Sequence, residues 1–180
     1  MSVEHVTTRA DWTIREINTE TGEVIERDGK NLVTNAGRAM LYGLLFMLTG
    51  SAGVVAMAPG ASSTAATVND TRLTHELIDT TGRKALTSTG GSALSAADII
   101  NETTVIESVT YYTRLTCMAE WPAGEGTGHT YAEYGLVSTI DSPATPTTES
   151  GTLFNDYVYD SPSIKGASTV LQIMLTLRWG

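Results

Sequence analysis

The chain of 180 residues has few cysteines, few histidines and few basic residues, and each shortage excludes a class of protein. Its one cysteine, Cys117, cannot form an intrachain disulfide, so a disulfide-stabilised secreted scaffold is excluded. Eleven Lys and Arg against 20 Asp and Glu give a net charge of −9, and we expect no nucleic-acid partner because phosphate binding needs clustered cations. His5, His75 and His129 form no ligand pair one helical turn apart, so we expect no metal and no cofactor.

Common enzyme and targeting motifs are also missing. No Gly-x-Ser-x-Gly nucleophile motif occurs, and the glycine-rich residues 124–128 match neither a Walker loop nor a dinucleotide fingerprint. Residues 1–16 are polar, so we expect no secretory signal. Residues 39–58 carry no charge, but glycines interrupt them, and the dense apolar part at 41–48 spans only about 12 Å as a helix. We therefore expect no membrane span.

Alternation of apolar and polar side chains is the clearest pattern that is present. From Glu102 to Trp121 this alternation indicates one or two half-buried strands. From Leu171 to Trp179 it predicts a strand that lines the core. Short turns between the predicted strands favour antiparallel pairing, because parallel pairing would need helical crossovers. Further strand-like runs lie at residues 12–18, 24–27, 54–58, 83–87, 130–140 and 153–159.

One segment has helical periodicity instead. Leucines recur at helical spacing over residues 41–48, after Asn35, which is a favourable N-cap. The sequence therefore predicts a mainly β protein, an antiparallel β-sandwich with one buried helix over about residues 35–48 packed against it. We expect a flexible N-terminal arm at residues 1–11 and a single β-sandwich domain over residues 12–180.

Acidic side chains on the predicted strands raise the alternative of a glycan hydrolase. Such chemistry needs two carboxyl groups several Å apart across a cleft, and sequence spacing does not pair them. We therefore expect no enzymatic activity. The candidate carboxylates are Glu107, Glu120, Glu133 and Asp156.

Tyrosines occur in adjacent or alternating positions on the predicted strands. Exposed tyrosines can stack on sugar rings or fill a protein interface, whereas tyrosines that face the interior would pack across neighbouring strands. Both interpretations stay open, and the first supports a host-receptor or glycan-binding module as an alternative function. The possible interface residues are Tyr131, Tyr134, Tyr157 and Tyr159.

Three short segments follow one another in a characteristic order. The first is Gly-Lys-Asn-Leu-Val-Thr-Asn-Ala-Gly-Arg at residues 29–38, directly before the apolar helix. The second is Ala-Pro-Gly at residues 58–60, a Ser/Thr/Ala-rich loop, and Asn-Asp-Thr-Arg-Leu-Thr-His-Glu at residues 69–76. The third is Tyr-Ala-Glu-Tyr-Gly-Leu-Val at residues 131–137, followed by Thr-Leu-Phe at 152–154 and the closing strand. In this order the segments resemble small virion proteins of tailed bacteriophages, among them the attachment domains of tail-fibre and baseplate proteins and related accessory proteins.

This resemblance implies a non-enzymatic structural protein of the virion, made in the host bacterial cytoplasm. It implies a homo-oligomer that contacts other phage structural proteins on the tail, neck or baseplate, or decorates the capsid. Asparagines in the segments can bond neighbouring backbone, glycines allow close backbone approach, and Glu133 can be a buried acceptor for backbone N–H groups or for Arg38. The residues expected to specify the fold are Asn31, Asn35, Gly37, Arg38, Glu133 and Gly135.

Overall fold

The strands form two sheets. The computed structural model describes residues 8–30, 32–39, 53–78, 82–141, 143, 145 and 150–179. The first sheet contains β1 (Thr8–Asn18), β2 (Val24–Lys30), β6 (Ile99–Ile106), β7 (Val109–Trp121) and β10 (Thr169–Trp179). The second contains β3 (Leu32–Val33), β4 (Ala56–Gly60), β5 (Lys84–Ala85), β8 (Thr130–Val137) and β9 (Leu153–Ile164).

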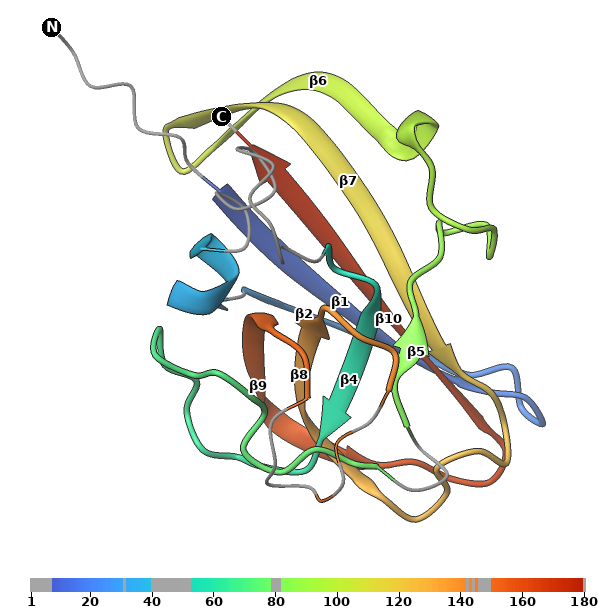
Figure 1. Cartoon of the computed structure of the whole chain (residues 1–180). Coiled ribbons are helices and arrows are strands. Elements are labelled where there is room, and N and C mark those ends of the chain that lie inside the picture. Colours follow the sequence, from blue (N-terminus) through green and yellow to red (C-terminus); the bar gives the residue numbers. More distant parts are fainter. Residues whose placement is uncertain are drawn as a thin grey trace, which may run out of the picture.

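All pairs among the described strands are antiparallel, which confirms the predicted β-sandwich. The strand order is β2-β1-β10-β7-β6 in the first sheet and β3-β9-β8-β4-β5 in the second. In Figure 1 the first sheet lies behind the second. A short 3-10 helix, η1 (Ala96–Asp98), precedes β6.

The main core lies between the two sheets. Alternate residues of β1, β7 and β10 project into it from the first sheet, and Tyr134, Leu136 and Phe154 enter it from the second. Cys117 is buried in this core, and burial raises the pKa of its thiol to about 12. The cysteine therefore stays a neutral, packed side chain, as the alternating pattern around it indicates.

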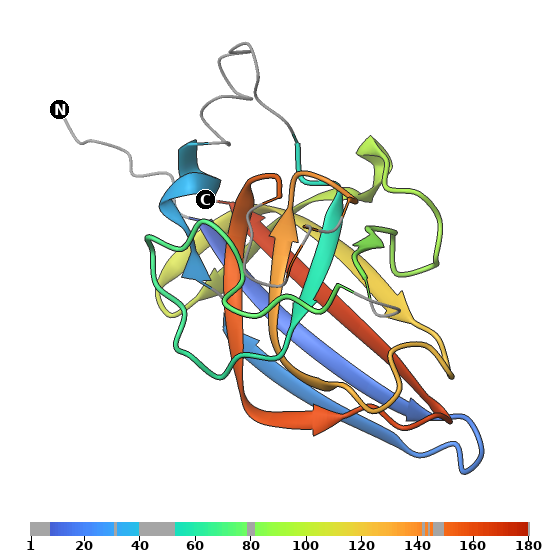
Figure 2. The same cartoon turned by 60° about the horizontal axis from the view of Figure 1, so that its bottom comes forward.

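A second, smaller core lies on the other face of the second sheet. It contains Ala56, Ala58, Leu73, Val137 and Leu153. Leu73 belongs to residues 61–78, which we call the covering segment, and Figure 2 shows this segment crossing the second sheet on the side away from the first. Backbone hydrogen bonds from Ala61 to His75 and from Leu77 to Pro59 tie the covering segment to the end of β4.

The structure corrects one predicted boundary, that of the N-terminal arm, and agrees with the predicted start of the helix. Residues 8–11 do not belong to a flexible arm, because they form the start of β1 and pair with β10 from Trp179 to Thr176. Residues 1–7 lie outside the described residues. The helix begins at residue 35 and is described to residue 39, and the rest of the predicted helix, to residue 48, lies outside the described residues. None of the helices in the described part of the chain has the length and apolar character needed to cross a bilayer.

Candidate functional site

The three motif segments, far apart in the sequence, meet around the covering segment. Asn35, at the start of the helix, donates from its side-chain amide to Asn69 at 3.0 Å, and its backbone N–H donates to Val68 at 2.7 Å. Asn31 lies outside the described residues, and Arg38 is exposed on the helix. The first motif segment therefore holds the covering segment mainly through Asn35.

The helix start rests directly on the backbone of β9. The N-cap is Thr34 rather than Asn35, because the Thr34 hydroxyl accepts a hydrogen bond from Gly37 N–H at 3.0 Å. The same hydroxyl donates to the Leu153 carbonyl at 2.8 Å. A Cβ atom placed on Gly37 would lie 1.9 Å from the Phe154 carbonyl oxygen, so only glycine fits at this contact.

Replacement of Gly37 by alanine is expected to lower the free energy of unfolding by about 3 kcal/mol or more, because rigid backbone cannot move aside for the added methyl group. The matched control is Gly90→Ala, where the new Cβ would meet only the Ser88 hydroxyl at 3.8 Å. This control is expected to change stability by less than about 1 kcal/mol. Urea denaturation followed by tryptophan fluorescence measures both, and equal stabilities of the two variants would contradict the prediction.

Glu133 fixes the covering segment to β8. Its side chain is fully buried, and its carboxylate accepts the backbone N–H groups of Thr74 at 2.7 Å and His75 at 3.2 Å. Burial raises the pKa of Glu133, while the two backbone donors oppose that rise. A Cβ on Gly60 would lie 2.4 Å from the Glu133 carboxylate, so this motif glycine leaves room for the acid. The partners of Glu133 are thus backbone N–H groups, one of the two possibilities expected from the sequence.

Asn155 was missed by sequence reasoning, because one polar residue in a strand carries no distinctive signal. Its side-chain oxygen accepts the backbone N–H of Leu136 at 2.7 Å, next to the register shift between Leu136 and Val137. The side chain therefore supplies an acceptor beside the point where the β8–β9 pairing is irregular. Gly135 lies beside it, and a Cβ there would approach Leu153, Leu73 and the Asn155 carbonyl at 2.6, 2.8 and 2.9 Å.

Asp156 is the most unusual acid of the site. It is 1% exposed, and its Oδ1 atom has no hydrogen-bond partner among the described residues. Burial is the main reason why the pKa of Asp156 rises to about 8, and the negative charges of Glu133 and Asp70 add to it. Asp70 belongs to the covering segment, and its carboxylate accepts the Thr67 N–H at 2.6 Å. Asp156 is therefore mainly protonated, and so uncharged, at neutral pH.

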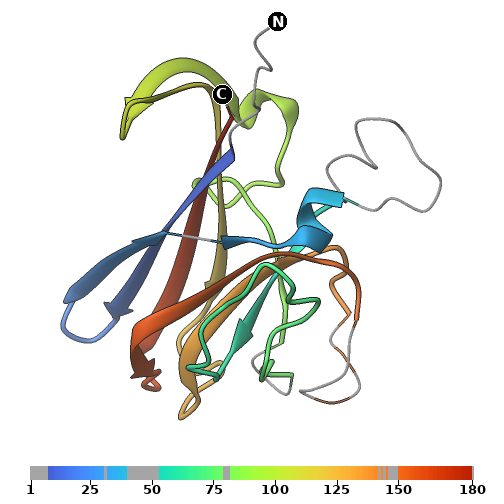
Figure 3. The ribbon, with the colours of Figure 1, turned by 90° about the vertical axis from the view of Figure 1, so that its left-hand side faces the viewer.

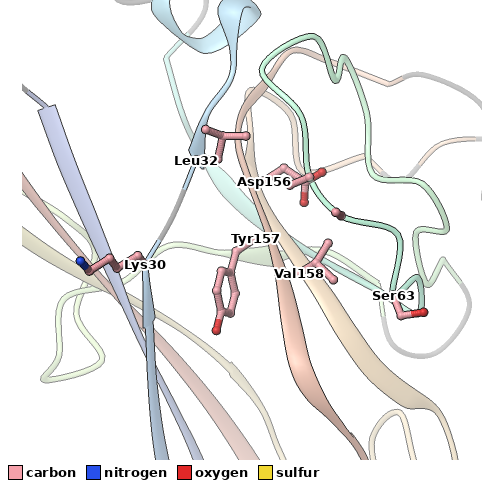
Figure 4. A pocket seen from close by; sticks show the side chains of 8 residues that line it. Lys30, Leu32, Ser63, Asp156, Tyr157 and Val158 are labelled. Carbon is pink, nitrogen blue, oxygen red and sulfur yellow. The ribbon is translucent and has the colours of Figure 1, made fainter.

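A pocket of about 340 Å³ opens beside Asp156. Figure 4 shows the Asp156 carboxyl group pointing toward the covering segment, while the Lys30 ammonium points away from it. Lys30 instead pairs with Glu107. Among the residues that the structure describes, no group of three or more His, Cys, Asp or Glu side chains is arranged to hold a metal ion. The pocket is lined by Lys30, Leu32, Ser63, Ala65, Ala66, Asp156, Tyr157 and Val158.

The structure overturns the interface expectation for three of the four tyrosines. Tyr131, Tyr134 and Tyr159 are at most 7% exposed and belong to the main core. Tyr157 is half-buried, and its ring stacks on Trp12 with centroids 6.0 Å apart. These side chains pack between the sheets because they face inward, which is the alternative that the sequence left open.

The four acids considered for a hydrolase lie in different parts of the structure. Glu107 is exposed in the turn after β6, where it pairs with Lys30 and Arg9. Glu120 is exposed on β7 and accepts a hydrogen bond from Gln172 at 2.8 Å. Only Glu133 and Asp156 come close to each other, and both Glu133 oxygens are occupied by backbone donors.

The described residues thus define an antiparallel β-sandwich in which the buried acid Glu133 holds a covering segment against one sheet. Comparison with known proteins finds no match among protein-family models, curated protein sequences or solved structures. The function is therefore inferred from the geometry of the chain itself.

Proposed function

We infer that the protein is a non-enzymatic structural component of a tailed-bacteriophage particle. It assembles as an oligomer with other virion proteins on the tail, neck or baseplate, or on the capsid surface. The observation that carries this proposal is the packing role of the motif residues. Glu133 binds backbone N–H groups, and Gly37 and Gly135 lie against backbone and side chains with no room for a Cβ.

This packing role matters because it agrees with what the resemblance implies. In an enzyme or a receptor-binding module, some residues of such motifs would reach substrate or receptor. Here the segments at residues 29–38, 58–76 and 131–137 hold one another instead. These motifs specify the fold and supply no reactive group. This agrees with a structural protein that occupies a defined place in a shell or tube.

Most of the residues that supported the glycan-binding and hydrolase alternatives have packing roles in the structure. The glycan-binding alternative relied on exposed tyrosines, and three of the four are in the main core. The hydrolase alternative needs two available carboxyl groups across a cleft, whereas the Glu133 oxygens are held by Thr74 and His75. The net charge of −9 favours soluble free subunits before assembly, because like charges lower nonspecific association.

The test is to look for the chain in phage particles purified by density gradient from infected cells. Quantitative mass spectrometry is expected to find it in a fixed ratio to the major capsid protein, and antibody labelling in electron microscopy assigns it to the tail or the head. A host cytoplasmic protein from the same lysate serves as the contamination control. If the chain is abundant in the lysate but falls to the level of that control in particles, the proposal is wrong.

A further inference from the structure

The four edges of the two described sheets differ in how they are protected. An edge strand presents unpaired backbone groups, and proteins usually protect it by short length or by charged side chains. β3 and β5 have two residues each. β2 is rich in charged side chains, with the sequence Val-Ile-Glu-Arg-Asp-Gly-Lys. β6 has eight residues and a single charged one, Glu102, which is paired with Arg114 at 2.8 Å.

β6 therefore combines a long open edge with exposed apolar side chains. Ile99, Ile100 and Val105 are 50%, 45% and 65% exposed, and Tyr112 on the neighbouring β7 is 59% exposed. Among the described strands only β7 pairs with β6. Figure 1 shows β6 along the rim of the first sheet, and Figure 3 shows the hairpin of β6 and β7 extending beyond the second sheet.

A bulge in β6 decides which side chains share a face. The register shifts between Asn101 and Thr104, so that β6 has one residue more than β7 at this point. Ile100 lies opposite Arg114 and Val105 lies opposite Thr110. Residues 110 and 114 are an even number apart on β7, so Ile100 and Val105 project from one face although they are five residues apart. By the same reasoning Ile99 and Ile106, opposite Leu115 and Val109, project from the other face.

We propose that β6 pairs antiparallel with β6 of a second copy of this chain, about a twofold axis between Glu102 and Thr103. In this register Ile100 lies opposite the partner's Val105, and Ile99 lies opposite the partner's Ile106. Apolar side chains therefore meet on both faces of the joined sheet. Glu102 lies opposite the partner's Thr103, so the two carboxylates are not directly opposed.

The partner of β6 is a second copy of this chain because the sequence pattern of β6 is self-complementary. Apolar residues stand at both ends, 99–100 and 105–106, and polar residues fill the centre, 101–104, so the pattern is the same in either direction. Self-complementarity of this kind is what a twofold contact requires. A regular strand would place residues 100 and 105 on opposite faces, and the bulge is what makes the register consistent. The local charge does not oppose the contact, because Arg114 already pairs with Glu102.

The pairing deepens the proposed assembly role and rests on it, since it names one surface through which copies of the chain meet. It joins the two five-stranded first sheets of a pair of subunits into one continuous sheet. Both open β6 edges are covered at once, which removes the unprotected edge.

Cysteine cross-linking of the full chain tests the register. In the Ile100→Cys/Val105→Cys double variant, the thiol at position 100 of one subunit lies opposite the thiol at position 105 of the other. Their Cα atoms are about 5 Å apart, a separation that a disulfide can bridge. In either single variant the thiol is roughly 15 Å from its copy in the partner. Under mild oxidation we expect the double variant to run as a covalent dimer on non-reducing gels and both single variants as monomers. The native Cys117 is buried and does not compete.

A charge on the edge provides a second test. Sedimentation velocity of the unmodified protein is expected to show a dimer, and Val105→Lys is expected to convert it to a monomer with unchanged far-ultraviolet circular dichroism. The matched control Val24→Lys, at an exposed position of β2, should remain dimeric. The pairing is refuted by a monomeric unmodified protein at high micromolar concentration, by a dimeric Val105→Lys variant, or by equal cross-linking of single and double variants.

These results are independent of the particle test. If the chain is present in particles but the cysteine pair does not cross-link, the β6 pairing fails and the assembly role stands. If the pair cross-links but the chain is absent from particles, the virion role fails and the protein is a dimer of another kind.

Discussion

The free energy of unfolding is expected to fall as the pH rises from about 5 to about 8, and Asp156→Asn is expected to remove most of this fall. Burial, with the charges of Glu133 and Asp70, raises the pKa of Asp156 from 3.8 to about 8 in the folded protein. Between these two values the folded chain keeps a proton that the unfolded chain releases. The favourable contribution is therefore complete below the unfolded pKa and is lost as the pH rises through the folded pKa.

The size of the effect follows from the same linkage. One proton bound only by the folded state changes stability by about 1.4 kcal/mol per pH unit, so the whole window is worth several kcal/mol. Glu133 contributes in the same direction, because burial raises its pKa as well. Lys30 does not offset these acids, since its ammonium points away from Asp156 and pairs with Glu107 (Figure 4).

Urea denaturation at pH 5, 6, 7, 8 and 9 measures this slope. The series extends to both sides of the pKa of about 8 for Asp156. The amide of Asp156→Asn keeps the shape of the protonated acid but cannot ionise, so the variant should be the more stable protein at pH 9. Glu23→Gln, at an exposed position in the turn before β2, is the matched control and should keep the full slope. An unchanged slope in Asp156→Asn would show that the acid cluster does not determine the pH dependence.

The sequence predicts the strands of the first sheet well, because one of their faces packs on a core and the other meets solvent. This contrast produces the alternation of β7 and β10, whose even and odd residues are buried to different extents. The number of strands between residues 102 and 121 stayed open because the turn between β6 and β7 is Glu107-Ser108. Both residues adopt positive φ, +52° and +67°, where Asn-Gly is the recognisable signal.

The positions of the tyrosines show why the alternation of apolar and polar residues could not identify interface residues. Strand periodicity assigns side chains to two faces but does not say which face is covered. In addition, the register shift between Tyr131 and Glu133 interrupts the alternation, so that Tyr131 and Tyr134, three residues apart, both enter the main core. Glu133 and the motif glycines act locally enough for their roles to be expected from the sequence. The influence of the Asp70 charge on the pKa of Asp156 depends on how the covering segment folds back over the second sheet, which no local pattern encodes.

Arg83→Met is expected to lower the free energy of unfolding by about 3–5 kcal/mol, because it leaves the Glu76 carboxylate buried without a counter-charge. The two side chains are 2% and 4% exposed, and the guanidinium contacts both carboxylate oxygens, at 2.7 and 2.9 Å. Arg83 also donates to the Thr139 carbonyl at 3.1 Å. Glu76 lies in the covering segment, opposite Gly60 of β4, so loss of the pair should loosen this segment first.

A double-variant cycle separates the ion pair from general packing. In Arg83→Met/Glu76→Met both charges are gone, and because no isolated charge stays buried, the double variant should regain much of the stability that Arg83→Met loses. Arg15→Met is the matched control, since Arg15 pairs with Glu26 at 3.1 Å with side chains 36% and 53% exposed. Exposed pairs of this kind contribute about 0–1 kcal/mol. Urea denaturation of the unmodified protein, Arg83→Met, Glu76→Met and the double variant gives the coupling energy. A double variant that is less stable than Arg83→Met would mean that the pair itself, rather than the avoidance of a lone buried carboxylate, stabilises the covering segment.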